Sequence, residues 1–561
     1  MRLIIALPAR AILGTIALLL TTCLTNAPML RSAQHANPAA ISSDARYYDI
    51  GAPITTDLWV DPISGSDNNS GATRAHALRS LNAAWERIPQ NTMLAETGYR
   101  VMLAAGEYPE SVLPNYLESR HGTAQFPVII QAADGRGSAV LRGDLNIFDA
   151  HYLYLIDLVI APTPPGDTLH CEQCDHLLMR GLRLDGGQFE PDGTEEVAHD
   201  NLKVNQSKHV YLEDSEITGA TDNAVDYVAV QYGHVVGNGV YNAQDWCMYV
   251  KGGSAHLRVE ANEFSDCGTG GFTAGQGTGF QFMTSPWLHY EAHDVKVINN
   301  IVHDTAGAGL GVNGGHNILL AYNTLYRIGG RDHVLEFTFG ARSCDGEADE
   351  AGRERCGSYR AAGGWGTTVV DDGTNYVRIP NRNVYVYNNI VYNPADYQHG
   401  GQHFAIPGPQ VPPPGSNAPN PTLADENLQL RGNIIWNGPL DLALGIEDDE
   451  QGCQPTNRTC NAAQLRADNA INTVEPQLSG LACGSLRPLV DGNLFGISAY
   501  PIPDFPANDL PAIPRSPEGT LTNIVSFDRI GTARMADDPP GAYRAGSMVG
   551  CVHLPLVLGR S

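Results

Sequence analysis

Charge is scarce in this sequence, and positive charge is scarcer than negative charge. Charged side chains make up 17% of the 561 residues, and 35 basic residues stand against 61 acidic ones. The formal net charge of −26 argues against any long-range attraction to nucleic acid, so we expect no nucleic-acid partner. The same charge would repel a polyanionic sugar, unless local cations or a bound metal ion reversed the field.

The composition also does not favour long surface helices. Glycine (60 residues) and proline (36 residues) are plentiful, which favours many short strands joined by turns. An apolar run at 11–20 follows Arg2 and Arg10 and is too short for a comfortable membrane span, so we interpret residues 1–23 as an export signal. The block ending at Cys23 resembles a bacterial lipoprotein processing site, although Thr22 departs from the usual small residue. A lipid anchor and plain secretion therefore both stay open.

Ten cysteines remain when Cys23 is set aside from the eleven, an even number suited to disulfides in an oxidising compartment. The expected local pairs are Cys344 with Cys356 and Cys453 with Cys460. The spacing Cys171-x-x-Cys174 is also compatible with a redox or zinc site, but the sequence has no matching second pair. We expect a protein that is secreted, or held at the cell surface or in the periplasm.

One phrase recurs along the chain: a polar turn residue, then an apolar residue, and six positions after the first an asparagine followed by aliphatic residues. The asparagines of this phrase are Asn262, Asn300, Asn323, Asn389 and Asn433, and Ser215 stands at the same place in an earlier copy. The shortest interval, 23 residues between Asn300 and Asn323, holds three short strands. Such a coil cannot bury its own interior, but coils stacked about 4.8 Å apart can, with the asparagine amides bonded along the stack.

The repeat therefore predicts an all-β fold, a single-stranded right-handed parallel β-helix over residues 56–440. A linker at 24–55 precedes it, an N-terminal capping segment opens it, and residues 441–561 form an irregular, disulfide-containing C-terminal extension. Residues 57–88 are similar to the opening of many secreted β-helices, where a strand and a turn lead into a capping helix, here about 81–88. The segment PPGAY at 539–543 resembles a motif that often closes them.

On these segments the chain resembles the pectate-lyase-like superfamily of secreted right-handed β-helices. The resemblance implies the fold strongly and the chemistry weakly, because the superfamily includes lyases, hydrolases, epimerases and non-catalytic adhesins. It also implies that calcium paired with a basic residue is a recurrent catalytic arrangement.

Extra residues interrupt the repeat at about 342–377, at 407–424 and around 279–283. They fall mainly after the same strand of each coil, so we expect them to gather along one edge and build a binding cleft, with neutral surface elaboration as the alternative. In four coils a polar residue follows a valine of that strand, and we expect these residues to form one outward row of substrate-binding groups. They are Asn205, Gln231, Lys251 and Asn313.

A lyase acting on a uronic acid must remove the proton at C5 while the neighbouring carboxylate is neutralised. Lys251, on an outward strand beside small residues, is the predicted base, and Lys203 and Arg342 are further cations able to hold a substrate carboxylate. The predicted calcium ligands are Asp200, Asp222, Asp226 and Asp245. The remaining predicted substrate contacts are Trp287, His289, Tyr290 and Glu336. A salt-bridged surface lysine and acidic residues that cap turns are the plain alternatives.

These features predict an exported carbohydrate-active protein, foremost a lyase that cleaves an anionic, uronic-acid-containing polysaccharide by β-elimination. A glycoside hydrolase, in which Glu336 and a neighbouring aspartate would supply the carboxyl pair, stays open, as does a C5-epimerase. A non-catalytic glycan-binding surface protein is the alternative outside the enzymes. We expect a calcium-dependent monomer that meets a membrane only through a lipid anchor at Cys23.

Overall fold

The computed structural model describes residues 46–162, 166–187, 197–344, 350–369, 377–398, 401–448, 450–481, 486–507, 509 and 520–544. The expected export signal at 1–23 and the expected linker up to residue 45 lie outside the described residues. Among the described residues, no helix is long and apolar enough to cross a membrane.

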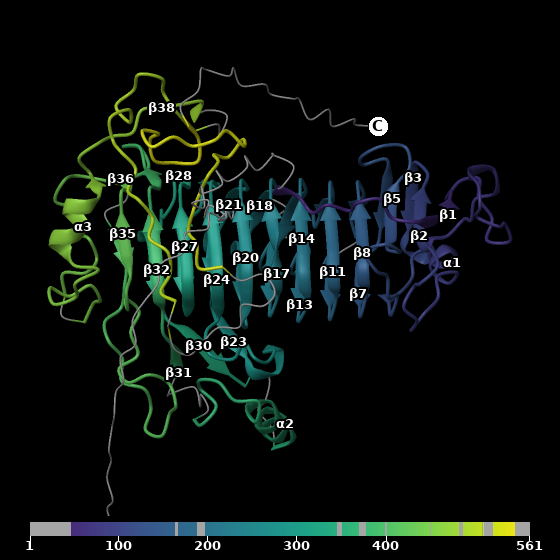
Figure 1. Cartoon of the computed structure of the whole chain (residues 1–561), viewed down its shortest axis with the longest axis horizontal. Helices are drawn as coiled ribbons and strands as arrows, with labels where there is room; N and C mark the ends of the chain where they lie inside the picture. The colour runs from purple at the N-terminus through teal and green to yellow at the C-terminus, as the bar shows by residue number, and fades with distance from the viewer. Residues whose placement is uncertain are drawn as a thin grey trace, which may run out of the picture. The chain divides into compact units, whose positions relative to one another are not determined.

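Three long parallel sheets run side by side along the body, as Figure 1 shows for residues 46–544. Each coil contributes one strand to the first sheet, one to the third and one to the second, in that order along the chain. Consecutive strands within a sheet come from consecutive coils and are all parallel. The predicted right-handed parallel β-helix is therefore confirmed.

The first sheet has twelve strands: β1 (Thr55–Val60), β2 (Gly98–Leu103), β5 (Val128–Ala132), β8 (His151–Ile156), β11 (Asp175–Arg180), β14 (Lys208–Glu213), β17 (Gln231–Val236), β20 (Ser254–Glu260), β24 (Ala292–Ile298), β27 (Gly315–Ala321), β32 (Arg382–Tyr387) and β35 (Gln429–Arg431). The second sheet has ten: β4 (Leu117–Glu118), β7 (Leu145–Phe148), β10 (Leu169–Glu172), β13 (Leu202–Asn205), β16 (Val225–Val228), β19 (Trp246–Lys251), β22 (Gly270–Ala274), β26 (Ala308–Asn313), β29 (His333–Thr338) and β34 (Gln402–Ala405).

The third sheet has twelve: β3 (Gly106–Pro109), β6 (Ala139–Arg142), β9 (Val159–Ile160), β12 (Arg183–Asp185), β15 (Glu216–Ala220), β18 (Gly239–Ala243), β21 (Glu263–Cys267), β25 (Ile301–His303), β28 (Thr324–Tyr326), β33 (Ile390–Tyr392), β36 (Ile434–Trp436) and β37 (Ala470–Ile471). Two small sheets complete the strands, one of β23 (Gly277–Gly279), β30 (Gly340–Ser343) and β31 (Val377–Ile379), the other of β38 (Leu478–Ser479) and β39 (Arg487–Pro488). The α-helices are α1 (Leu81–Trp85), α2 (Glu350–Arg360) and α3 (Ala462–Asp468), and the 3-10 turns are η2 (Arg74–His76), η3 (Glu110–Val112) and η4 (Phe280–Phe282).

Aliphatic side chains stacked from coil to coil fill the interior. One column of the first sheet places a buried aliphatic residue at the same register position in five successive strands. Its members are Leu212, Val235, Val259, Val297 and Leu320. Each such side chain contributes about 1.5–3 kcal/mol when it leaves water, so the column is a major source of the fold's stability.

The predicted asparagine ladder is confirmed. The backbone N–H of each ladder asparagine donates to the side-chain oxygen of the next one at 2.9 or 3.0 Å, from Asn238 through Asn262, Asn300, Asn323, Asn389 and Asn433 to Asn469. Ser215 joins the ladder at its start, where its N–H donates to Asn238. The amides therefore satisfy buried turn backbone in every coil of this stretch.

The ends of the body also follow the sequence analysis in outline. Helix α1 begins after Ser80, whose hydroxyl accepts from the N–H of Ala83, and it buries Leu81 and Trp85 under the first coil. The last stacked strand is β37, so the coils continue past residue 440, the boundary expected from the fading repeat. Beyond it the chain folds back, and Figure 1 shows its yellow trace crossing the first sheet near β27 and β32. There Phe505 packs against Leu319 and Tyr385.

Four disulfides lie among the described residues. The expected pairs Cys344–Cys356 and Cys453–Cys460 are confirmed. Cys171 and Cys174 are bonded to each other, which removes them as zinc ligands, and Cys247–Cys267 joins the second and third sheets. Cys23, Cys483 and Cys551 lie outside the described residues.

Candidate functional site

The insertions gather on one edge, as the spacing predicts. They follow β22, β29 and β34. In the second sheet these strands occur in the order β22, β26, β29, β34, so only β26 separates them. Strand β23 from the first insertion pairs with β30 from the second, so the two insertions form one joined layer beside the second sheet. Figure 1 shows this layer, with α2, projecting from the body.

The outward row beside this layer is present, but with one member changed. Asn205, Val228 and Lys251 are in register in β13, β16 and β19. The expected position of Gln231 is wrong, because this residue begins β17 in the first sheet and is buried, with its amide donating to Gly253 O at 3.1 Å. In β16 the interior residue that precedes the row is Tyr227, whereas β13 and β19 have a valine at that position. Because the sequence alignment used valine as its marker, it selected Gln231, three residues after the true row member Val228.

A cavity of about 190 Å³ opens between the row and the insertion layer. Strands β13, β16 and β19 form its floor, and residues 277–282 form its wall. It is lined by Lys203, Asn205, Asp222, Asp226, Val228, Tyr249, Lys251, Gly277, Thr278, Gly279 and Phe282. Five of these residues are candidates from the sequence, contributed by three successive coils.

Lys251 enters this cavity without a carboxylate partner. Its ammonium donates to Gln276 Oε1 at 2.9 Å and lies 4.3 Å from the centre of the Tyr249 ring, and no ion pair to it is found within the described residues. The next residue, Gly252, has a φ of +67°, and a Cβ there would lie 2.8 Å from Val228. Glycine therefore permits the tight turn that ends β19 directly behind the lysine.

Lys203 is bound very differently. Its ammonium lies 2.5 Å from Asp200 Oδ2 and 3.4 Å from Asp226 Oδ2. Although burial lowers the pKa of Lys203, the carboxylates of Asp226 and Asp200 raise it above the usual lysine value. Lys203 therefore stays protonated and neutralises part of the local negative charge.

The carboxylates of this site carry more negative charge than Lys203 can offset. Burial, followed by repulsion from Asp200, raises the pKa of Asp226 to about 6. Burial, with Asp200 and Asp245 next, also raises the pKa of Asp222. The Oδ1 atom of Asp226 is buried, and no hydrogen-bond partner for it is found among the residues that the structure describes. Asp200 and Asp226 both hold the Lys203 ammonium, and the ligand atoms of Asp200, Asp222 and Asp226 do not all lie within 4.8 Å of one another in the described part of the chain, so a calcium ion held by these residues stays a prediction.

Asp245 lies at the edge of this group. It is half-buried, and its backbone N–H donates to the carbonyl of Asp222 at 2.9 Å. It does not line the cavity, and its negative charge helps to raise the pKa of Asp222.

Arg342, Trp287 and Tyr290 do not reach the cavity, in contrast to their expected roles. Arg342 is fully buried in an ion pair with Glu291, and its guanidinium donates to Tyr290 O at 3.2 Å. Trp287 and Tyr290 are also buried, and Tyr290 packs edge-on against Trp365. These side chains hold the insertion layer together, so they are unavailable for binding a sugar.

The other predicted substrate contacts lie beyond the cavity. His289 packs edge-on against Trp365, and burial followed by the charge of Arg342 lowers its pKa. Asn313, in β26, donates to Glu336 Oε1 in the adjacent strand β29 at 2.9 Å, and β26 lies two strands from β19 in the second sheet. This pair could contact a longer chain that extends along the sheet from the cavity.

Tyr249 is the main site residue that the sequence analysis missed. It stands two positions before Lys251, so the alternation of a strand places both side chains on the same outward face. Burial, followed by the charge of Asp226, raises the pKa of its hydroxyl well above the usual value. The two-residue spacing in the sequence was the available signal.

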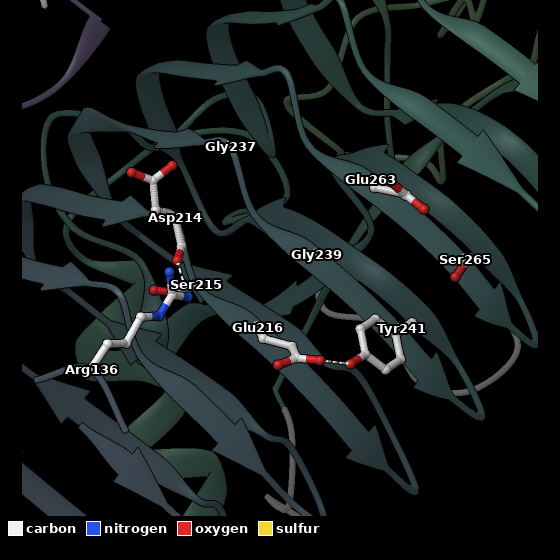
Figure 2. A pocket seen from close by; sticks show the side chains of 9 residues that line it. All are labelled: Arg136, Asp214, Ser215, Glu216, Gly237, Gly239, Tyr241, Glu263 and Ser265. Atoms are coloured by element: carbon white, nitrogen blue, oxygen red, sulfur yellow. Dashed lines mark hydrogen bonds between the residues drawn. The ribbon is translucent and has the colours of Figure 1, made fainter. Parts of the chain in front are cut away.

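A larger concavity of about 510 Å³ lies on the third sheet. Figure 2 shows its side chains, among which the Tyr241 hydroxyl donates to Glu216 and Arg136 donates to the backbone carbonyl of Asp214 at 2.6 Å. Arg136 is the one cation that lines it, and the lining has no lysine. The smaller cavity on the second sheet is therefore the better candidate for proton abstraction.

No family model matches the sequence, and no curated protein matches it. Among solved structures, the chain is similar to a rhamnogalacturonan lyase, with 11% identity, 67% of this chain and 87% of the other covered, and a TM-score of 0.39. It is similar to a PL6 family polysaccharide lyase from Pseudopedobacter saltans, with 12% identity, 71% and 93% covered, and a TM-score of 0.34. It is also similar to XylC in complex with xylose, with 11% identity, 87% and 98% covered, and a TM-score of 0.42. These likenesses concern the fold alone.

Proposed function

We propose that the protein is an exported, calcium-dependent polysaccharide lyase that cleaves a uronic-acid-containing glycan by β-elimination at the cavity of the second sheet. The observation that carries the proposal is that Lys251, which makes no ion pair with a carboxylate among the described residues, lines the same cavity as the carboxylates of Asp222 and Asp226. Removal of a proton next to a carboxylate requires a base to take the proton and a nearby group, such as a bound cation, to stabilise the negative charge that develops.

In this reaction Lys251, in its neutral form, takes the C5 proton of the sugar. The electrons of the C5–H bond form the C4–C5 double bond, the C4–O bond breaks, and the departing glycosidic oxygen takes up a proton from solvent water. Calcium, when bound by Asp200, Asp222 and Asp226, would neutralise the sugar carboxylate and so acidify C5–H. Asn205 offers an amide to the sugar hydroxyls, and Gln276 orients the lysine.

The test is the ultraviolet absorbance of unsaturated uronides on a panel of polyuronates, with EDTA and after calcium is restored. We expect Lys251→Met to abolish the signal, and Asp222→Asn to raise the calcium concentration needed for half-maximal activity. Lys208→Met is the matched control, because Lys208 is an exposed lysine of the first sheet. Wild-type rates from Lys251→Met would refute the assignment of the base.

A hydrolase is the second candidate, and one observation favours it. The buried carboxyl of Asp226, with its pKa raised to about 6, has the character of a general acid. Asp200, which binds the same Lys203 ammonium, would be the second carboxylate that a glycoside hydrolase needs. Hydrolysis would give new reducing ends without the unsaturated chromophore. A C5-epimerase would change the sugar configuration without cleavage, and a binding protein would retain glycan without turnover.

A further inference from the structure

A second group of metal-ligating side chains lies in earlier coils, apart from the proposed lyase site. His121 Nε2 lies 3.0 Å from Asp149 Oδ2, and His151 Nε2 lies 3.5 Å from Asp149 Oδ1. The three ligand atoms all fall within 4.8 Å of one another. The two imidazole rings are stacked, with centroids 4.4 Å apart and 23° between their planes.

The backbone fixes this arrangement. His121 and His151 are paired by a parallel bridge between successive coils, which sets one ring above the other. Asp149 has a φ of +50° in the turn before β8, and this left-handed conformation brings its carboxylate back toward both rings. The group is therefore built by the stacking of coils, and a bound ion would join two of them.

The chemistry of the group matches a zinc-type ion better than calcium. Two imidazoles and a carboxylate are ligands that zinc prefers, whereas calcium prefers oxygen ligands. Zinc–ligand bonds of about 2.0–2.1 Å in a tetrahedron place the ligand atoms about 3.3 Å apart. His121 Nε2 is 3.0 Å from Asp149 Oδ2, close to that spacing, and His151 Nε2 is 3.5 Å from the other oxygen, Oδ1.

The site is also accessible. The side chains of His121, Asp149 and His151 are 22%, 34% and 35% exposed, so an ion can enter and solvent can fill the fourth position.

A neighbouring group shows the contrast. His176 Nδ1 and His209 Nδ1 both lie 2.8 Å from the same oxygen of Asp175. Their rings are enclosed in a stack between Tyr152 and Tyr232. Both imidazole nitrogens are at hydrogen-bond distance from one carboxylate oxygen, so hydrogen bonds within this group account for its arrangement.

We propose that His121, Asp149 and His151 form a binding site for a transition-metal dication of the zinc class, which links two successive coils. The site is independent of the proposed lyase chemistry.

The experiment uses the full chain, stripped with EDTA and then held in excess calcium so that oxygen-only sites are filled. Zinc is titrated by calorimetry, and cobalt is added in parallel to read a tetrahedral absorption band. We expect one zinc ion per chain, an affinity at least tenfold lower in His121→Ala and in His151→Ala, and a rise in Tm with zinc that both variants lose.

His76→Ala is the matched control, because His76 is exposed and its ring is hydrogen-bonded to Thr73, away from the proposed site. Asp149→Asn keeps the size of the side chain and serves where an alanine variant fails to fold; it should also weaken zinc binding at least tenfold. Zinc binding that is absent in the wild type, or unchanged in all three site variants, would overturn the proposal.

Discussion

Replacing Asn300 by alanine should destabilise the protein by about 4 kcal/mol. The side chain of Asn300 is fully buried and makes four hydrogen bonds. Its oxygen accepts from the N–H and the amide of Asn262 at 2.9 and 3.0 Å, and its own amide donates to Val259 O and to Asn323 Oδ1, each at 3.0 Å. At about 1 kcal/mol net for each bond, the loss is about 4 kcal/mol, because alanine leaves buried partners unsatisfied.

The measurement is the free energy of unfolding from urea titration, followed by fluorescence and by circular dichroism to test for a single transition. Asn300→Ser should lose less, because Ser215 already occupies a ladder position and keeps two hydrogen bonds through its hydroxyl. Asn115→Ala is the exposed control and should change the stability by less than about 0.5 kcal/mol. A loss below about 1 kcal/mol in Asn300→Ala would refute the reasoning that the ladder stabilises the coils.

Three further outcomes are expected. Despite burial, hydrogen bonds to Asp304 and Glu263 raise the pKa of His303 to about 9. The contribution of His303 to the free energy of unfolding is therefore complete below about pH 6.5 and is lost as the pH rises through 9. His303→Gln should remove this pH dependence from the urea midpoints. Because the pKa of Asp226 is raised to about 6, stability should fall as pH rises from about 4 through 6, and Asp226→Asn should flatten this fall. Arg342→Met should cost about 3–5 kcal/mol by leaving the Glu291 charge unpaired, and adding Glu291→Gln should recover part of it, both read from urea midpoints.

The fold could be predicted from the sequence because its repeat is carried by buried polar residues. An asparagine at a fixed place in each coil is needed to satisfy the turn backbone, so its place in the coil is kept although insertions lengthen the interval between neighbouring asparagines from 23 to 44 and 66 residues. The insertions could be placed for the same reason, since the ladder fixes which strand precedes them. The end of the coils was misplaced because β36 and β37 are separated by α3 and its flanking loops.

The candidate site could be predicted only in part. Lys203, Asn205, Asp222, Asp226 and Lys251 came together because each lies on or beside an outward strand of successive coils. Residues from the insertions were harder to assign, since a tryptophan or arginine in a long loop has the same local sequence whether it faces a ligand or the loop's own core.

Burial of Arg342 against Glu291 depends on contacts between two insertions that no strand pattern reveals. Gln231 was misassigned for a simpler reason, because one tyrosine replaced the valine used as a marker.

The contact between the two outermost described segments of the chain affects how the stack can come apart. Arg46 donates to the carbonyls of Asp528 and Arg529 at 2.6 and 2.7 Å, and Arg529 in turn donates to Asn262 O at 2.6 Å. A solenoid held only by neighbouring coils can peel open from either end. Here the segment at Arg46 and the segment at 528–529 bind each other over the coil that contains Asn262. Detachment of one segment therefore removes contacts of the other and exposes the coils that both cover.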